Sequence, residues 1–212
     1  LNWLEADLAA STATWKIVWV HHPLGGSPDK DEAPGDNYWD EVIDRLRPVG
    51  LDVFIAGHSH TYHRSFPLTG SSGSNATFVN DTDNDYEKGV GLVQVVTGTG
   101  GRSLRSGSFP NFIAEGRSTS TGGLEYGFTR VDVTPSQLTF RYIHDDNGAV
   151  EDTFTITTPA VAPGPPSNPS PTSGSIDFLV NDDLSWTPGS DATTHDVYFG
   201  TDPTPDAGEL KG

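Results

Sequence analysis

The chain has 212 residues, enough for one domain with a sizeable core and part of another, and it carries a formal net charge of −17. General nucleic-acid binding requires a basic surface, so this acidity argues against it. The absence of cysteine excludes disulfide bonds and a cysteine nucleophile, and the absence of an apolar run of ~18 residues predicts no membrane span.

The N-terminal third predicts two helices that alternate with two strands. Apolar residues at helical spacing predict a helix over 2–10, with Asn2 as its N-cap, and a second helix over 38–46. Nearly continuous apolar runs over 15–20 and 51–56 predict strands that are buried on both faces. Since loops at the carboxyl ends of strands carry the chemistry of α/β folds, we expect a site in the turns after these two strands.

The remainder of the chain, which is rich in glycine and proline, predicts strands and loops with little helix. The expected elements in chain order are a polar loop over 69–88, a strand over 89–98, a Gly/Ser/Arg-rich loop over 99–123, and strands over 124–133, 137–143 and 150–157. The Asp-Asp-Asn-Gly run at 145–148 predicts the hairpin turn before the last of these strands.

Proline is concentrated in the next segment, which predicts an extended linker over 158–170, with a long surface loop as the alternative. Residues 184–186 and 195–200 then resemble strands of a β-sandwich. Only about 45 residues follow the linker, which is roughly half of a sandwich domain, so we expect 171–212 to be a partial domain. Since the chain also starts at Leu1 and contains no methionine, we expect a fragment or a processed product.

Five of the seven histidines lie in the two turns that follow the predicted buried strands. His21 and His22 follow the first strand, and His58, His60 and His63 follow the second. Histidines at i and i+2 of such a turn can direct both rings into one cavity, and imidazole suits zinc, iron and related ions. A lone histidine would more simply be a core or loop residue, but the double cluster predicts a metal site.

The order of these motifs resembles the calcineurin-like metallophosphoesterases, in the purple acid phosphatase-like branch. The motifs are His21-x-Pro23, Gly57-His58-Ser59-His60, Tyr62-x-Arg64, the helix with Trp3-Leu4, and Gly98-Thr99-Gly100-Gly101. The resemblance covers residues 1–157 and implies an α/β fold, the C-terminal part of a four-layer α/β sandwich. It also implies a secreted or extracytoplasmic location.

The resemblance implies hydrolysis of small phosphate esters, as by an acid phosphatase, at two metal ions (Fe, Zn or Mn) with a metal-bound hydroxide. By this resemblance His21 and His58 hold one ion and His60 holds the other. The family's first half supplies aspartates, an asparagine and a further histidine that have no counterpart here. We therefore expect this chain to lack part of the centre and to be inactive alone.

Three further residues are candidates for substrate contact or for a supporting role near the site. His22 either contacts substrate or covers the site, and the same alternatives hold for His63, where relatives usually carry glutamate. Arg64 either binds phosphate through its planar guanidinium or forms a structural salt bridge.

Two observations bear on other functions. Residues 184–189 and 196–202 resemble fibronectin type III-like modules of secreted bacterial proteins, which are usually spacers or adhesion units. The alternative function is therefore a degenerate phosphoesterase-like binding or structural module of a secreted multidomain surface protein.

Three aspartates resemble part of a calcium loop, namely Asp81, Asp83 and Asp85. The glycine and glutamate of an EF-hand are not in place, which favours a solvated acidic loop.

Overall fold

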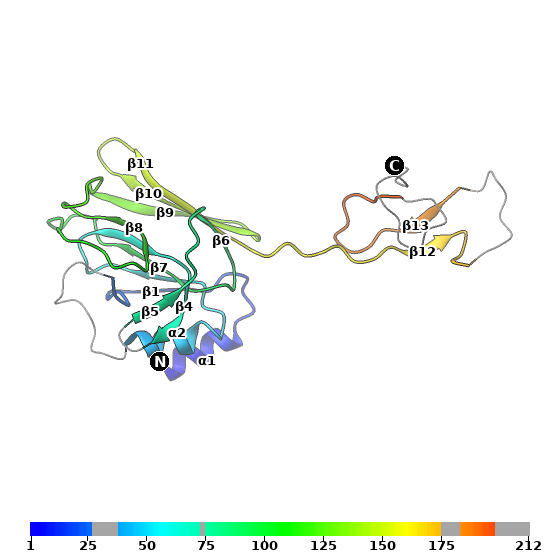
Figure 1. Cartoon of the computed structure of the whole chain (residues 1–212), viewed down its shortest axis with the longest axis horizontal. Coiled ribbons are helices and arrows are strands. Elements are labelled where there is room, and N and C mark those ends of the chain that lie inside the picture. Colours follow the sequence, from blue (N-terminus) through cyan, green and yellow to red (C-terminus); the bar gives the residue numbers. More distant parts are fainter. Residues whose placement is uncertain (27–37, 73–74, 175–182, 198–212) are drawn as a thin grey trace. The chain divides into compact units, whose positions relative to one another are not determined.

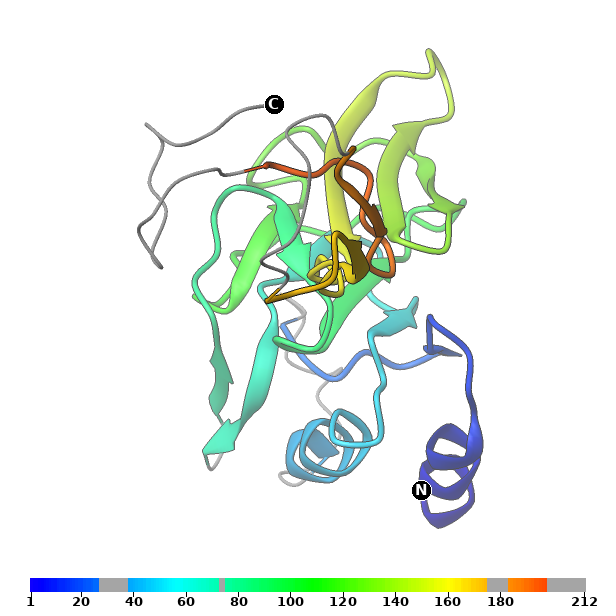
Figure 2. The same cartoon turned by 90° about the vertical axis from the view of Figure 1, so that its right-hand side faces the viewer.

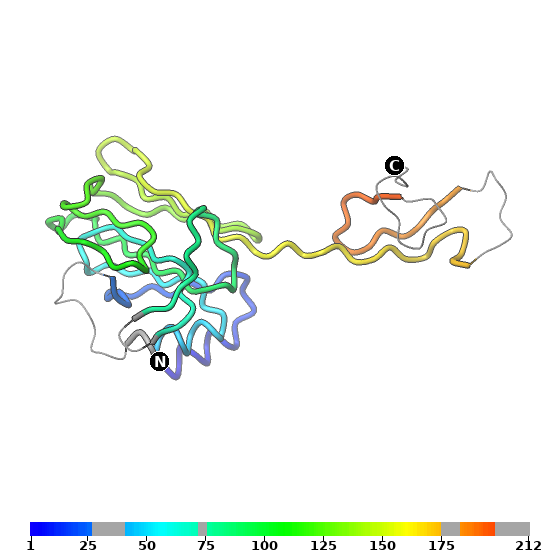
Figure 3. Tube along the Cα trace, viewed as in Figure 1, coloured from blue at the N-terminus to red at the C-terminus, as the bar shows by residue number. Residues whose placement is uncertain are grey.

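The computed structural model describes residues 1–26, 38–72, 75–174 and 183–197. The chain divides into two compact units, Leu1–Pro159 and Ala160–Gly212 (Figure 1; Figure 3 shows the trace). No helix among the described residues is long and apolar enough to cross a bilayer.

The first unit is built on a five-stranded mixed sheet. In spatial order its strands are β1 (Ile17–Val20), β2 (Val53–Ala56), β7 (Val93–Thr97), β3 (Tyr62–Ser65) and β8 (Ile113–Arg117). Strands β1, β2 and β7 run parallel, whereas β3 is antiparallel to β7 and β8. Val20 pairs with Ala56, so the carboxyl ends of β1 and β2 lie side by side and the two histidine turns leave the sheet together.

Each face of this sheet is covered by a different layer (Figure 2). Helices α1 (Asn2–Ala10) and α2 (Tyr38–Leu46) pack on one face. A four-stranded sheet packs on the other, with the order β6 (Asp85–Glu87), β11 (Val150–Thr157), β10 (Gln137–His144) and β9 (Gly127–Val133). Neighbouring residues of a strand point to opposite faces, so Val53 packs toward the second sheet and Phe54 toward the helices, and both are buried.

The prediction that the first strand is buried on both faces is wrong. Val18 packs among the helices, but Ile17 is 39% exposed and Trp19 is 76% exposed. The reason is that β1 lies at the edge of its sheet, while the side chains facing the second sheet come from β2, β7 and β3. The predicted cap also differs: the helix begins at Asn2 with Leu1 as N-cap, and the described residues supply no side-chain cap hydrogen bond.

Several short strands lie where the sequence predicted loops. The polar loop over 69–88 contains the hairpin β4 (Leu68–Ser72) and β5 (Asn75–Phe78) as well as β6, and the loop over 99–123 contains β8. These strands are polar and lack the apolar alternation that identifies a strand in sequence. The predictions for β9, β10, β11 and their turn are confirmed, and Gly148 adopts a φ of 70° in that turn.

The second unit contains the antiparallel pair β12 (Ser167–Ser170) and β13 (Ser185–Thr187). Strand β12 falls within 158–170, the segment that the sequence predicts as an extended linker. The strand predicted over 195–200 lies partly outside the described residues, and no strand is present at 195–197. The β-sandwich therefore stays a prediction.

Candidate metal centre

Three imidazole rings meet where β1 and β2 end. His21 Nε2 lies 3.0 Å from His58 Nδ1, although the two residues belong to different turns. The ring of His22 lies beside both, and one ligand nitrogen from each of the three histidines lies within 4.8 Å of the others. The rings of His21 and His22 are exposed to solvent. The donor set fits a transition-metal ion, because neutral imidazole nitrogens are the ligands that such ions prefer.

The backbone of the second turn is sharply folded. His58 adopts a φ of 61°, a left-handed conformation that costs a non-glycine residue roughly 1–2 kcal/mol. The Ser59 N–H donates to the Gly57 carbonyl at 2.7 Å, and the Gly57 N–H donates to the His21 carbonyl at 3.1 Å. The left-handed residue of this turn is therefore His58, and the preceding Gly57 is not left-handed. Strained residues of this kind concentrate at functional sites.

A buried glutamine holds the loop that follows His22. The Gln94 side chain is fully buried, and its Oε1 accepts the Leu24 N–H at 2.6 Å. Its Nε2 donates to the Gly25 carbonyl at 2.8 Å. Gln94 was not among the residues expected at the site. A polar residue inside the apolar run of β7 is nevertheless a visible signal, because buried polar groups need partners.

Within the described part of the chain, His60 is not a member of this three-histidine cluster. Its Nδ1 lies 2.9 Å from the carbonyl oxygen of Ser103. A carbonyl only accepts, so Nδ1 carries the proton and Nε2 keeps its lone pair. Metal-binding histidines usually show this arrangement, in which the second ring nitrogen is held by a carbonyl or a carboxylate.

His63 is completely buried in β3. Its Nδ1 lies 3.1 Å from Thr61 Oγ1, which in turn lies 2.9 Å from Ser59 Oγ. Burial lowers the pKa of His63 to about 3, so the ring is neutral at ordinary pH. The His63 side chain therefore contacts the turn from inside the protein. Because His63 is completely buried, the structure does not favour the substrate contact that was considered for it.

Of the two roles considered for Arg64, the structure shows the salt bridge. Its Nε lies 2.7 Å from Asp152 Oδ2, and the two side chains are 1% and 5% exposed. Tyr62 donates to the same oxygen at 2.6 Å, and Asn84 accepts from Arg64 Nη2 at 2.7 Å. Burial and the Asp152 charge raise the pKa of Tyr62 well above its usual value, so the phenol remains a donor. Arg64 thus joins β3 to β11 and does not face the site.

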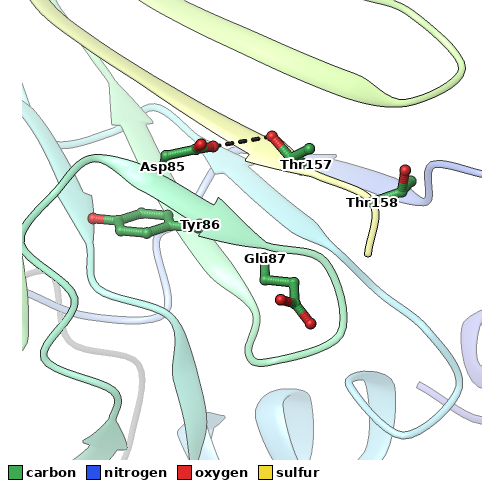
Figure 4. A pocket seen from close by; sticks show the side chains of 5 residues that line it. All are labelled: Asp85, Tyr86, Glu87, Thr157 and Thr158. Atoms are coloured by element: carbon green, nitrogen blue, oxygen red, sulfur yellow. Dashed lines mark hydrogen bonds between the residues drawn. The ribbon is translucent and has the colours of Figure 1, made fainter. Parts of the chain in front are cut away.

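A separate pocket of about 210 Å³ lies where β6 runs beside the end of β11 (Figure 4). Its lining residues are Asp85, Tyr86, Glu87, Thr157 and Thr158. The Asp85 carboxylate accepts hydrogen bonds from Thr155 and, at 2.9 Å, from Thr157.

The acidic loop before this pocket is closed by local hydrogen bonds. The Asp83 N–H donates to Asp81 at 3.3 Å, and the Asp85 N–H donates to Asp83 at 2.8 Å. Asp83 and Asp85 are exposed. This arrangement agrees with the predicted solvated loop.

A family resemblance lies in the second half of the first unit. Residues 91–153 match the iron/zinc purple acid phosphatase-like protein C family. The purple acid phosphatase-like segment begins at β7, contains the Gly98–Gly101 motif, and ends within β11. The chain thus has a purple acid phosphatase-like C-terminal domain, and the histidine turns precede the matched residues.

Two individual relatives are similar to this chain over a longer stretch than this segment. An acid phosphatase of Aspergillus ficuum is 28% identical over 172 residues, which are 77% of this chain and 27% of that protein. A nucleotide pyrophosphatase/phosphodiesterase of Hordeum vulgare is 31% identical over 153 residues, 67% of this chain and 38% of that protein. The chain therefore spans between a quarter and two fifths of the length of these relatives.

A solved structure confirms the mixed α/β fold. The purple acid phosphatase PPD1 from yellow lupin (Lupinus luteus) seeds superposes with a TM-score of 0.59 at 22% identity, over 74% of this chain and 28% of that one. At this identity the likeness concerns the fold.

Proposed function

We propose that this chain belongs to a phosphoester hydrolase with a dinuclear metal centre and supplies its histidine ligands. The observation that carries the proposal is the 3.0 Å approach of His21 and His58 at the ends of two neighbouring parallel strands. In this proposal His21 and His58 hold one ion and His60 holds the other. The ions are Fe, Zn or Mn, as the similarity to purple acid phosphatases suggests.

The residues of the chain would act by holding and orienting these ligands. Ser103 fixes the His60 ring with Nε2 free to bind, and Gln94 holds the loop after His22. When bound, two such ions polarise phosphate oxygens and lower the pKa of water, which permits hydrolysis without a protein nucleophile. A mechanism without a protein nucleophile agrees with the absence of cysteine from the sequence.

The remaining ligands would have to come from elsewhere in the protein. Among the described residues, the ligand group around His21 contains imidazoles alone, which carry no negative charge to offset two cations. The relatives are two and a half to four times longer than the matched part. We therefore propose that carboxylate ligands lie outside these 212 residues, and that the chain forms the C-terminal part of a four-layer sandwich.

The proposed substrates are small phosphate esters, with phosphomonoesters as the first choice and diesters or nucleotides as variants. The acid phosphatase and the pyrophosphatase/phosphodiesterase among the relatives support this class. The proposed arrangement is a catalytic part over 1–157, a linker over 158–170 and a fibronectin type III-like part over 171–212. We propose a secreted or extracytoplasmic location for the whole protein.

The test compares hydrolysis of p-nitrophenyl phosphate by this chain and by the full-length gene product, each supplied with Zn, Mn or Fe. We expect activity in the full-length protein, loss of that activity in His58→Ala, and negligible activity in the chain alone. Comparable activity of the chain alone would contradict the proposal that ligands lie elsewhere. An inactive full-length protein would favour the degenerate binding module.

A further inference from the structure

We infer that His22 is a metal ligand, and that His21, His22 and His58 together hold one transition-metal ion in this chain alone. The similarity to purple acid phosphatases suggested a role for His21 and His58, and the inference shares that pair with the proposed function. The assignment of His22 as a ligand rests on the structure. This assignment replaces the two roles that the sequence suggested for His22, which were to contact substrate or to cover the site.

The three rings form one cluster, in which each contacts the other two. The ring centres of His21 and His22 are 5.0 Å apart, those of His21 and His58 are 4.9 Å apart, and those of His22 and His58 are 4.1 Å apart. Two nitrogens that bind one tetrahedral Zn²⁺ at ~2.0–2.1 Å lie about 3.3–3.4 Å apart. The observed nitrogens lie within 4.8 Å of one another, and small rotations of the exposed His21 and His22 side chains would bring them to this geometry.

Adjacent histidines can share one ion here because the strand has ended. Inside a strand, His21 and His22 would point to opposite faces. The chain instead bends at these two residues, directly after β1. The segment beyond the bend is held by hydrogen bonds between the Gln94 side chain and the backbone of buried Leu24 and Gly25. The backbone that carries both rings is therefore anchored on each side, which lowers the entropic cost of ordering them around an ion.

The donor set selects the class of ion. Three neutral nitrogens without a carboxylate suit Zn²⁺, Cu²⁺, Ni²⁺ or Co²⁺ and do not suit Mg²⁺ or Ca²⁺, which prefer oxygen ligands. Three protein ligands leave a further coordination position open, as in catalytic zinc sites. The exposure of His21 and His22 places that position within reach of solvent.

The test measures metal binding by the purified metal-free chain. Zn²⁺ is titrated in competition with a chromophoric chelator, and the visible absorption of added Co²⁺ reports the ligand environment independently. We expect one tightly bound ion per chain, and a loss of affinity of at least about tenfold in His22→Ala, as in His21→Ala and His58→Ala. His195→Ala, in the second compact unit, is the matched control, and its affinity for this ion should stay within about twofold of the unmodified chain.

Two results would overturn the inference. One is a His22→Ala variant that binds Zn²⁺ as tightly as the unmodified chain with the same Co²⁺ spectrum. The other is a His60→Ala variant that weakens binding as much as His21→Ala, which would make His60 the third ligand. Thermal unfolding of each metal-free variant separates lost ligands from lost folding. Since no hydrolysis is measured, failure here and failure of the proposed phosphatase activity are distinguishable.

Discussion

Gly98 lies so close to Ser59 that a Cβ atom on Gly98 would stand 1.7 Å from the Ser59 carbonyl oxygen. The Gly98 N–H also donates to the Thr61 carbonyl at 3.1 Å. The end of β7 thus rests directly on the turn between His58 and His60. Only glycine fits this position, because any side chain would displace the backbone that carries the two histidines.

Gly98→Ala should therefore weaken metal binding by displacing the turn. We expect at least about tenfold lower Zn²⁺ affinity and a loss of about 1–3 kcal/mol in the free energy of unfolding, as for other overpacked sites. Gly100→Ala is the matched control, since nothing lies within 4 Å of its Cβ position. Chelator competition and urea unfolding give both quantities. Equal Zn²⁺ affinities and equal unfolding free energies of the two variants would show that the turn does not depend on the contact between Gly98 and Ser59.

The buried salt bridge of Arg64 and Asp152 should be sensitive to removal of either partner. Arg64→Met leaves the Asp152 carboxylate buried without its cation, and we expect a loss of about 3–5 kcal/mol in the free energy of unfolding. The exposed pair of Arg130 and Asp132 is the control, and Arg130→Met should leave the free energy of unfolding nearly unchanged, because solvent screens an exposed ion pair. Urea unfolding followed by fluorescence measures both. A small effect of Arg64→Met would mean that water reaches Asp152.

His63 should make the stability of the first unit depend on pH. Burial lowers its pKa from the ordinary 6.5 to about 3, so the native ring stays neutral while the unfolded chain takes up a proton below pH 6.5. Its contribution to stability is complete above pH 6.5 and decreases as the pH falls from 6.5 toward 3. The slope approaches about 1.4 kcal/mol per pH unit within this window.

The experiment compares unfolding free energies between pH 7 and pH 4.5 for the unmodified chain and His63→Asn. We expect the variant to lack this part of the pH dependence, whereas the control His195→Asn in the second unit should retain it. An unchanged slope in His63→Asn would show that other groups control the acid sensitivity.

The proposed linker predicts where a protease cuts first. Residues 160–166 precede β12 and include three of the chain's prolines, and the described side chains there are mostly exposed. Limited digestion with a nonspecific protease, followed by mass spectrometry, should give early cleavage between the two compact units. Early cleavage inside β9, β10 or β11 would contradict this organisation, because those strands are paired along their length.

Local patterns in the sequence determined the helices and the apolar strands, and they predicted the general position of the site. Apolar spacing located both helices and the strand at Val53–Ala56, because the side-chain period of each element is built into its backbone. Histidines placed directly after two successive strands indicated a metal site at the carboxyl edge of the sheet.

Tertiary structure alone decided which side chains meet and which remain exposed. Arg64 finds its partner 88 residues further along the chain, and Trp19 is exposed because the second sheet does not cover the edge strand. His22 joins His21 and His58 while His60 turns toward Ser103, because the bend after β1 and the left-handed His58 set the directions of the rings. Sequence spacing records distance along the chain, whereas ring orientation and long-range partners depend on how separate elements pack against one another.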